Sequence, residues 1–270
     1  MFALVESLLC CLQPVARASH PSVKQRKVHV PPQVHTTLAN PKERVIVIGD
    51  VHGCLDEMLE LLKACNYSED RDTVILVGDL VNKGPKSPGV VATARAKGFF
   101  AVRGNHDDSC LFAREKRERE RAEGRTPRAD DKYAYTDELS AEDVQYLRSL
   151  PYTISLPSLQ ALVVHAGLVP GVDLEAQDLA GMYTMRNLVK SLLSYQWSDR
   201  PKEGVPWAGE WRGRPHVYFG HDAKRGLQQY AHATGLDTGC CYGRSLSAMV
   251  LPERRLVQVA AKEMYSKPGG

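Results

Sequence analysis

The sequence has little of what would mark a membrane-spanning or disulfide-stabilised secreted protein. No apolar stretch among its 270 residues approaches the ~20 residues that a transmembrane helix needs, so we expect no membrane span. The seven cysteines are odd in number and show no spacing typical of a disulfide framework or a zinc knuckle. We therefore expect reduced thiols and an intracellular protein, with the cytoplasm as the first compartment and the nucleus or an organelle left open.

The sequence also lacks an excess of charge beyond its first 40 residues. Four basic residues and one acidic residue in residues 1–40 account for the net charge of +3, and the rest of the chain is neutral. A neutral catalytic region gives no general argument for nucleic-acid binding, although a local basic groove stays open. No obligate protein partner is evident from the composition.

Residues 1–40 are predicted to form a flexible basic tail. Prolines recur in this segment and no sustained apolar period runs through it. The apolar start contains Glu6 and no basic residue before it, so a secretory signal fits poorly. Cys10 and Cys11 leave acylation or a docking segment open. We expect one catalytic domain over residues 41–270.

Four apolar runs each lead into a polar motif. Residues 44–48 precede GDVHG, residues 73–77 end on GDLVNKG, residues 99–102 precede RGNHD, and residues 161–164 precede HAG. Such unbroken runs are typical of buried strands, and α/β sheets bind ligands just beyond the carboxyl ends of their strands. We therefore expect an α/β fold in which these motifs converge.

Other patterns predict the surrounding elements. Leu55, Met58, Leu59 and Leu62 are expected on one face of a helix after the first motif. The apolar runs at residues 216–220, 245–251 and 255–260 are expected to form a second sheet.

Residues 114–125 alternate acidic and basic side chains at helical spacing. This pattern predicts a solvated helix held in part by weak ion pairs. An RNA-contacting arm is the less favoured interpretation, because the opposite charges nearly cancel.

The motifs supply a mixed nitrogen and oxygen ligand set for two divalent metal ions. Its members are Asp50, His52, Asp79, Asn105, His165 and His221. Such ligands suit first-row metals, so we expect Mn²⁺ or Co²⁺, with Mg²⁺, iron and Zn²⁺ as alternatives. Asp79 is the natural bridge between ions ~3.5 to 4 Å apart, which together activate a water for in-line attack on phosphorus. Each motif alone is weak evidence, but their joint order completes one site.

In this order, over residues 44–265, the motifs resemble the calcineurin-type metallophosphoesterase superfamily. The resemblance implies a two-sheet β-sandwich flanked by helices. It places Asp50, His52 and Asp79 at the first metal, and Asp79, Asn105, His165 and His221 at the second. It also makes His106 the proton donor to the leaving group.

The residues between the ligands indicate a subfamily. Protein serine/threonine phosphatases carry Asp-Arg after the second motif and Glu after Asn-His, where this chain has Asn82, Lys83 and Asp107. The runs GDLVNKGPKS, MYTMRN, GHDAKRGLQ and GLDTGCCYG are instead similar to the ApaH-like phosphatases. These are related to bacterial diadenosine tetraphosphatase, and some eukaryotic members cleave mRNA caps.

Asn82 is a candidate catalytic residue beside His106. A neutral amide would orient the ring with less electrostatic help than an aspartate, which leaves His106 a weaker proton donor. A nucleotide phosphate leaving from an anhydride needs less acid assistance than a serine alkoxide. The amide thus favours anhydride substrates, with an ordinary turn residue as the alternative reading of Asn82.

Four cations are candidates for holding substrate phosphates. Lys83 stands where the relatives place an arginine, Arg186 matches by motif position, and Lys224 and Arg225 lie near His221 in the sequence. A solvated surface cation is the alternative for each. The candidates for stacking on a base, which are alternatively core residues, are Tyr183, Trp197, Trp207 and Tyr242.

The sequence therefore predicts a hydrolase of dinucleoside polyphosphates, such as diadenosine tetraphosphate, with capped mRNA as a further substrate. Attack by a metal-bridging hydroxide is the expected chemistry, with Asp79, Asn82 and His106 as catalytic residues. Two alternatives stay open: a protein serine/threonine phosphatase or polyphosphatase with the same metal site, and a catalytically silent binding scaffold.

Overall fold

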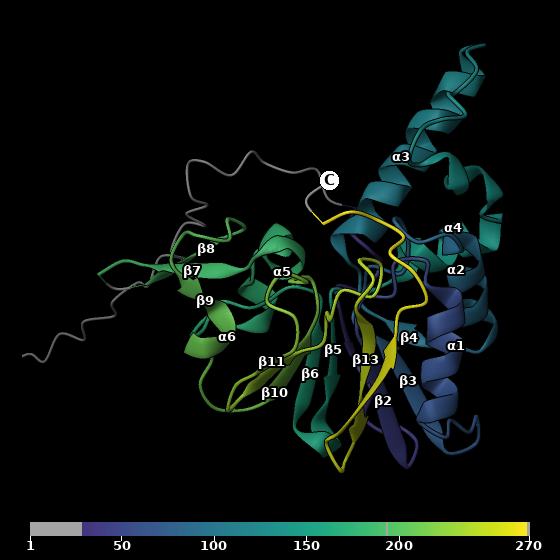
Figure 1. Cartoon of the computed structure of the whole chain (residues 1–270). Coiled ribbons are helices and arrows are strands. Elements are labelled where there is room, and N and C mark those ends of the chain that lie inside the picture. The colour runs from purple at the N-terminus through teal and green to yellow at the C-terminus, as the bar shows by residue number, and fades with distance from the viewer. Residues whose placement is uncertain (1–28, 193, 269–270) are drawn as a thin grey trace, which may run out of the picture.

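A six-stranded and a five-stranded sheet pack face to face at the centre of the molecule (Figure 1). The computed structural model describes residues 29–192 and 194–268. The predicted flexibility of residues 1–28, and Cys10 and Cys11 within them, lie outside the described residues. The expected two-sheet β-sandwich with flanking helices is confirmed.

The spatial order of the strands in each sheet differs from their order along the chain. The five-stranded sheet comprises, from one edge to the other, β14 (Arg255–Ala260), β13 (Ser245–Leu251), β2 (Arg44–Ile48), β3 (Asp72–Leu76) and β4 (Phe100–Ala101). The six-stranded sheet comprises β1 (His35–Thr37), β5 (Thr153–Leu156), β6 (Ala161–Val164), β10 (His216–Phe219), β12 (Ala233–Gly235) and β11 (Gln228–Gln229). A third, small sheet holds β8 (Tyr195–Ser198), β7 (Asn187–Lys190) and β9 (Val205–Pro206).

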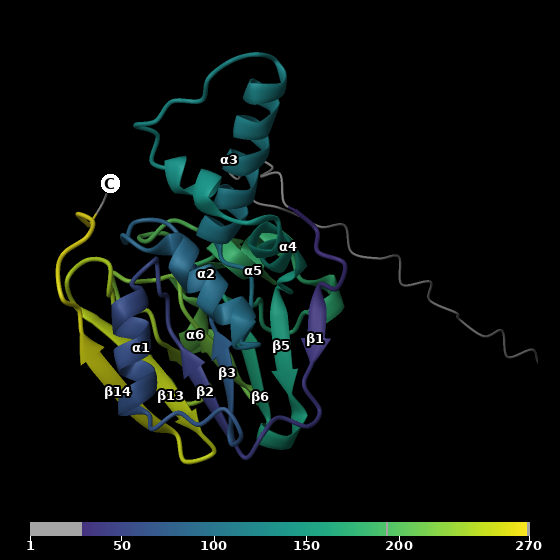
Figure 2. The ribbon, with the colours of Figure 1, turned by 90° about the vertical axis from the view of Figure 1, so that its right-hand side faces the viewer.

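Helices cover the outer faces of the sandwich. Figure 2 shows helices lying across the five-stranded sheet. The helices on that side are α1 (Leu55–Ala64), α2 (Ser87–Ala96) and α4 (Ala141–Ser149). The other side of the sandwich carries the small sheet with α5 (Leu179–Thr184) and α6 (Trp207–Glu210). The remaining helix, α3 (Asn105–Ala122), projects beyond the body of the molecule in both views.

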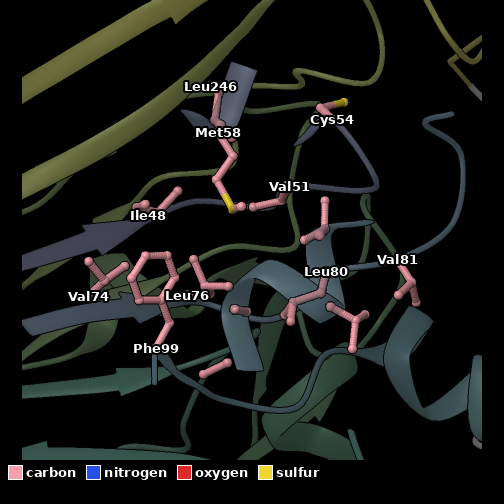
Figure 3. Packing of buried hydrophobic residues seen from close by; sticks show 14 of the residues in the cluster. Ile48, Val51, Cys54, Met58, Val74, Leu76, Leu80, Val81, Phe99 and Leu246 are labelled. Carbon is pink, nitrogen blue, oxygen red and sulfur yellow. The ribbon is translucent and has the colours of Figure 1, made fainter. Parts of the chain in front are cut away.

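The central strands β2, β3 and β6 are mostly apolar because both of their faces are buried. In β2, Val45 and Val47 belong to the core between the sheets, whereas Ile46 and Ile48 belong to the core under the helices. This alternation follows from the period of two along a strand. Figure 3 shows Ile48 and Met58 of the helix-side core packed near one another. Within α1, Met58 is buried as expected, but Leu59 is 44% exposed.

The strands of the final third do not form a separate sheet, which corrects the sequence prediction. β10 pairs with β6 in the six-stranded sheet, whereas β13 runs antiparallel to β2 in the five-stranded sheet and β14 pairs with β13. The apolar pattern of a strand indicates that its faces are buried, but it does not specify the neighbouring strand. Pairing partners far apart in the chain therefore escaped prediction.

The folded part of the chain begins before the predicted boundary at residue 40. β1 pairs in parallel with β5, with His35 opposite Thr153. Earlier still, the backbone carbonyl of Val34 accepts a 2.8 Å hydrogen bond from the N–H of Tyr152. The proline-rich composition of this segment hid a three-residue strand that completes the edge of the sheet.

Two broader expectations concern membranes and thiols. Within the described residues, no helix is long and apolar enough to cross a membrane. The cysteines of the described part are free and buried, and they are Cys54, Cys65, Cys110, Cys240 and Cys241.

The C-terminal segment is held against the body by a buried carboxylate. Glu57 of α1 is 1% exposed and accepts hydrogen bonds from the hydroxyl of Tyr265 (2.8 Å) and the backbone N–H of Lys262 (3.0 Å). Ser266 N–H donates to the carbonyl of Cys241 at 2.9 Å. This anchoring brings Pro268 to the rim of the cavity over the predicted metal ligands.

Tyr265→Phe is expected to lower the free energy of unfolding by about 2 kcal/mol, since it removes a donor from a buried carboxylate. Urea denaturation followed by circular dichroism measures the change. The matched control is Tyr195→Phe, which removes a 2.8 Å hydrogen bond to the partly exposed Glu210 and should cost well under about 1 kcal/mol. Equal losses in the two variants would contradict the anchoring role of Glu57.

Candidate metal centre

The predicted ligands all follow the carboxyl ends of central strands. Asp50 and His52 come after β2, Asp79 after β3, Asn105 after β4, His165 after β6 and His221 after β10. β2, β3 and β4 run parallel in one sheet, and β6 and β10 run parallel in the other. The strand ends therefore bring the polar loops to one edge of the sandwich.

Asp79 lies at the centre of the ligand set. Its Oδ2 is 3.4 Å from Nε2 of His52, and its Oδ1 is 3.5 Å from Nε2 of His165. Asp79 is shared by two clusters with the spacing of metal ligands, one with His52 and His106 and the other with Asp50 and His165. A single carboxylate thus faces both halves of the centre, as a bridging ligand must.

The amide of Asn105 connects the remaining two histidines. Its Oδ1 lies 3.2 Å from Nε2 of His165 and 3.0 Å from Nδ1 of His221. The backbone N–H of His221 is 3.2 and 3.1 Å from the two oxygens of Asp50. The structure therefore brings all six predicted ligands into one cluster.

Hydrogen bonds to the backbone fix the tautomers of the three ligand histidines. Nδ1 of His52 contacts the carbonyl of Val81 at 3.1 Å, Nδ1 of His165 contacts that of Val77 at 2.8 Å, and Nε2 of His221 contacts that of Thr184 at 3.0 Å. Because a carbonyl only accepts, each of these nitrogens carries the proton. The other ring nitrogen is left with a lone pair. Histidines that bind metals are usually oriented in this way.

The lone pairs of His165 and His221 fit a metal site because they face other acceptors. Nε2 of His165 and Nδ1 of His221 both point at the Asn105 amide oxygen, and Nε2 of His165 also lies beside the Asp79 carboxylate. Acceptors that face each other at such distances are unfavourable without a cation between them. The donor chemistry of nitrogen and oxygen ligands matches first-row divalent ions.

His106 has the opposite tautomer from His52 and His165. The Asn82 side chain contacts Nδ1 of His106 at 2.8 Å, while its Oδ1 accepts the backbone N–H of Lys83 at 2.9 Å. With the oxygen engaged by Lys83, the amide nitrogen of Asn82 faces His106 and donates to Nδ1. The proton of the neutral ring is therefore on Nε2, which lies 4.0 Å from Asp79 Oδ2. Burial lowers the pKa of His106 to about 4, which favours this neutral form.

Asp107 joins two of the ligand loops. Its carboxylate accepts the backbone N–H groups of Asp79 (2.8 Å), Leu80 (2.9 Å) and Gly104 (2.9 Å). Burial, with the charge of Asp79, raises the pKa of Asp107 to about 7. The acid that follows Asn-His in the sequence is thus a structural clamp that holds the Asp79 loop against the Asn105 loop.

The loops adopt unusual backbone conformations at the site. Eight non-glycine residues of the described part have positive φ, and five of them are His52, Asp79, Asn82, Lys83 and His221. Positive φ is strained for such residues and tends to occur at functional sites. A Cβ at Gly104 would collide with the Asp79 carboxylate, so the glycine permits the close approach of the two loops.

A cavity of about 320 Å³ opens over the cluster. Three of the four predicted phosphate-binding cations, Lys83, Arg186 and Lys224, line it. Lys83 Nζ is 2.9 Å from Nε2 of His52, and its charge lies over the Tyr242 ring at 5.1 Å from the centroid. The cavity therefore places cations beside the metal ligands.

Arg225 is placed differently from the other three cations. Its guanidinium donates to Asp222 at 2.6 Å and to Asn187 at 2.7 Å. Among the described residues it is not one of those that line the cavity. These bonds join the loop after His221 to β7, which is a structural role for Arg225. Its contact with substrate phosphate stays a prediction.

Sequence reasoning missed three charged residues of the cavity, Asp222, Asp237 and Arg244. Asp237 is buried, and burial raises its pKa to about 6. Arg244 donates to the carbonyl of Ala223 on the opposite rim. A signal was present, because Asp237 lies within the GLDTGCCYG run and Arg244 follows it directly.

The predicted stacking aromatics are mostly core residues. Tyr183, Trp197 and Trp207 are buried in the cluster behind the six-stranded sheet. Tyr242 alone of the four lines the cavity.

Over residues 43–238 the chain matches the family of calcineurin-like phosphoesterases. The chain belongs to this family. The family implies a dinuclear centre of divalent metal ions, and the cluster of nitrogen and oxygen donors around Asp79 fits one. The phosphoesterase is therefore a metal-dependent hydrolase of phosphoric esters or anhydrides, and the alternative of a silent scaffold is set aside.

The relatives of this phosphoesterase indicate its subfamily. It is 26% identical to an asymmetrical bis(5'-nucleosyl)-tetraphosphatase of Halalkalibacterium halodurans, over 80% of this chain and 94% of the relative. It is 28% identical to a symmetrical bis(5'-nucleosyl)-tetraphosphatase of Yersinia pestis, over 77% and 89% of the two chains. A crystal structure of a candidate diadenosine tetraphosphatase is 37% identical, with a TM-score of 0.76 over 85% of this chain and 98% of its own. The phosphoesterase is thus of the ApaH-like type.

A more distant likeness concerns the fold alone. A protein serine/threonine phosphatase from Saccharomyces cerevisiae is 18% identical and covers 86% of this chain and 84% of its own, with a TM-score of 0.51.

Proposed function

We propose that this phosphoesterase hydrolyses phosphoanhydride bonds of dinucleoside polyphosphates such as diadenosine tetraphosphate. The observation that carries the proposal is the hydrogen bond from the Asn82 amide to Nδ1 of His106, in an orientation fixed by the Lys83 N–H. The bond leaves His106 neutral, with its proton on Nε2. The names of the relatives, which are tetraphosphatases, support the same substrate class.

The state of His106 bears on the leaving group. A neutral imidazole can donate a hydrogen bond from Nε2, but it cannot give up that proton without forming an unstable imidazolate. An imidazolium would need a second proton on Nδ1, which would then face the donor of Asn82. The site therefore assists a leaving group that departs as a stable anion, and a nucleotide phosphate is one. A serine alkoxide needs a full proton.

The other residues of the centre have separate tasks in this proposal. Two divalent ions, when bound, supply an activated water and neutralise charge on the phosphoryl group. Asp50, His52, Asp79, Asn105, His165 and His221 would hold them. Lys83 and Arg186 neutralise the equatorial oxygens of the phosphorus under attack. Lys224 extends the same positive charge along the cavity, where neighbouring phosphates of the chain lie.

Capped RNA is the second substrate in the proposal. A cap joins two nucleosides through a phosphate chain, so its bonds have the same chemistry as those of a dinucleoside polyphosphate. An intracellular, cytoplasmic location belongs to the proposal as well, because the free cysteines of the described part suit a reducing compartment.

A substrate panel tests the proposal. The protein is assayed with Mn²⁺ or Co²⁺ on diadenosine tetraphosphate, capped RNA, inorganic polyphosphate and a phosphoserine peptide, in water enriched with heavy oxygen. We expect kcat/KM for the dinucleoside to exceed that for the phosphopeptide by at least about a hundredfold, the range that acid assistance spans. Mass spectrometry of the labelled products locates the phosphorus attacked. Faster turnover of the phosphopeptide, or of polyphosphate, would overturn the assignment.

A further inference from the structure

A second hollow lies along the projecting helix and plays no part in the metal chemistry. It has a volume of about 400 Å³ and is lined by Ser109, Phe112, Ala113, Lys116, Asp131 and Tyr133. We name it the α3 groove. One wall comes from α3, and the other comes from the chain that folds back beside this helix, as both ribbon views show (Figures 1 and 2).

The α3 groove continues a face of the helix that begins at the metal centre. Asn105, Ser109, Phe112 and Lys116 follow one another at steps of four, three and four residues, so they share one face of α3. Ser109 Oγ donates to the Asn105 carbonyl at 2.8 Å. At 1.5 Å per residue, Phe112 lies about 10 Å and Lys116 about 16 Å along the axis from the metal ligand Asn105. The face therefore leads outward from the metal ligand Asn105.

The opposite wall of the groove is held by fixed contacts. Tyr133 donates its backbone N–H to the Asp131 carboxylate at 3.0 Å. Arg117, only 3% exposed, donates to Asp137 at 3.1 Å and to the carbonyl of Arg128 at 3.0 Å. A buried arginine in an otherwise solvated charged helix departs from the sequence prediction, and its task is to hold the returning chain against α3.

The groove combines aromatic surface with charges of both signs, since Lys116 and Asp131 both line it. Phe112 and Tyr133 contribute rings from the two walls, and Lys116 adds a cation at the outer end. Lys132 lies over the Tyr133 ring, with Nζ 5.0 Å from the centroid.

We propose that the α3 groove binds the nucleoside at one end of a nucleoside polyphosphate whose phosphates occupy the metal cavity. Aromatic rings offer faces on which a base can stack, and nearby lysines attract the attached phosphates. The distance of about 10 Å along α3 matches the reach from a phosphorus within a short phosphate chain to its nucleoside. The proposal deepens the proposed function and rests on it.

Apart from histidines, the described residues of the metal cavity offer one aromatic ring, Tyr242, whereas those of the α3 groove offer two, Phe112 and Tyr133. A lysine ammonium lies over one ring at each place, Lys83 over Tyr242 and Lys132 over Tyr133. Phe112 packs against His29 at 3.9 Å between ring centroids. This contact fixes the second ring of the groove.

Competitive inhibition of a substrate without a nucleoside tests the groove directly. Hydrolysis of bis(p-nitrophenyl) phosphate is measured at fixed free Mn²⁺ with ADP or inorganic pyrophosphate as inhibitor. We expect Tyr133→Ala to raise the inhibition constant of ADP about tenfold, which corresponds to the free energy of stacking one base on an aromatic ring. The inhibition constant of pyrophosphate should stay unchanged. Tyr133→Phe, which keeps the ring, should restore most of the ADP affinity. Phe112→Ala should act like Tyr133→Ala.

The matched control is Arg119→Ala. It removes a cation from the exposed surface of the same helix, outside the groove, and both inhibition constants should stay as in the wild type. Lys116→Ala removes a cation within the groove and should raise the inhibition constant of ADP several-fold. Pyrophosphate is the reference for an intact metal centre in every variant.

The outcomes separate the groove from the proposed function. If Tyr133→Ala leaves the inhibition constant of ADP unchanged, the α3 groove does not bind the nucleoside, even if the protein cleaves diadenosine tetraphosphate. Loss of ADP affinity in Tyr242→Ala alone also overturns the groove proposal, because the base would then lie in the cavity. If the wild type releases no nucleotide from diadenosine tetraphosphate, the proposed function fails, whereas ADP inhibition that depends on Tyr133 still supports a nucleoside site.

Discussion

Asp79→Asn is expected to abolish hydrolysis of every phosphorus substrate, with kcat falling by roughly a thousandfold or more. Asp79 Oδ2 faces Nε2 of His52, and Oδ1 faces Nε2 of His165. A carboxylate shares a negative charge between two oxygens and would serve both ions, whereas an amide offers one neutral oxygen. Both halves of the centre therefore lose affinity for metal at once.

The fold should survive this substitution. Asp79 Oδ1 accepts the backbone N–H of His106 at 2.9 Å, and the oxygen of an asparagine can accept the same bond. The amide N–H₂ would then lie beside Nε2 of His52 and beside Lys83, without the negative charge that the carboxylate supplies there. The variant is thus expected to keep its melting temperature and lose its metal, a combination that general misfolding does not produce.

Metal content by plasma mass spectrometry and kcat with added Mn²⁺ are the measurements. The control is Asp56→Asn on α1, which removes an exposed ion pair between Asp56 and Lys86. This variant should behave as the wild type. Full metal content together with full activity in Asp79→Asn would refute the bridging role.

The ligand set could be predicted from the sequence because it depends on local patterns. Each ligand follows an apolar run with a glycine nearby, and parallel strands deliver their carboxyl ends to the same edge. The pairing of β13 with β2 had no such local signal. Residues 35–37 gave no signal for β1 either, because a strand of three residues is too short to show a period.

The cavity and the α3 groove depend on contacts between distant segments. Ser109 and Tyr133 line one groove although 24 residues separate them, and what joins them is the buried Arg117. The alternating charges of that helix predicted only solvated ion pairs. Such pairs exist, as between Arg114 and Glu118 at 2.6 Å, but the pattern does not reveal which arginine turns inward.

His106→Ala is expected to slow the reaction modestly and by a similar factor for good and poor leaving groups. The neutral ring, held by Asn82, supplies a hydrogen bond from Nε2 and no full proton. The loss should therefore be within about tenfold both for diadenosine tetraphosphate and for an alkyl phosphate ester. Rates for a series of esters with graded leaving-group pKa, with the tetraphosphate as the anhydride, measure it, and a loss that grows steeply with leaving-group pKa would show that His106 donates a full proton.

Asn82→Asp should change the same series in the opposite direction. A carboxylate can accept the Lys83 N–H with one oxygen and a proton-bearing Nδ1 of His106 with the other, so the local contacts are kept. The negative charge would stabilise the imidazolium form and raise the pKa of His106. Rates for poor leaving groups should then rise several-fold and depend less steeply on leaving-group pKa, while the tetraphosphate rate changes little. If the two proteins gave the same slope, the Asn82 amide would not be what limits proton donation by His106, and the preference for anhydrides would need another origin in the cavity.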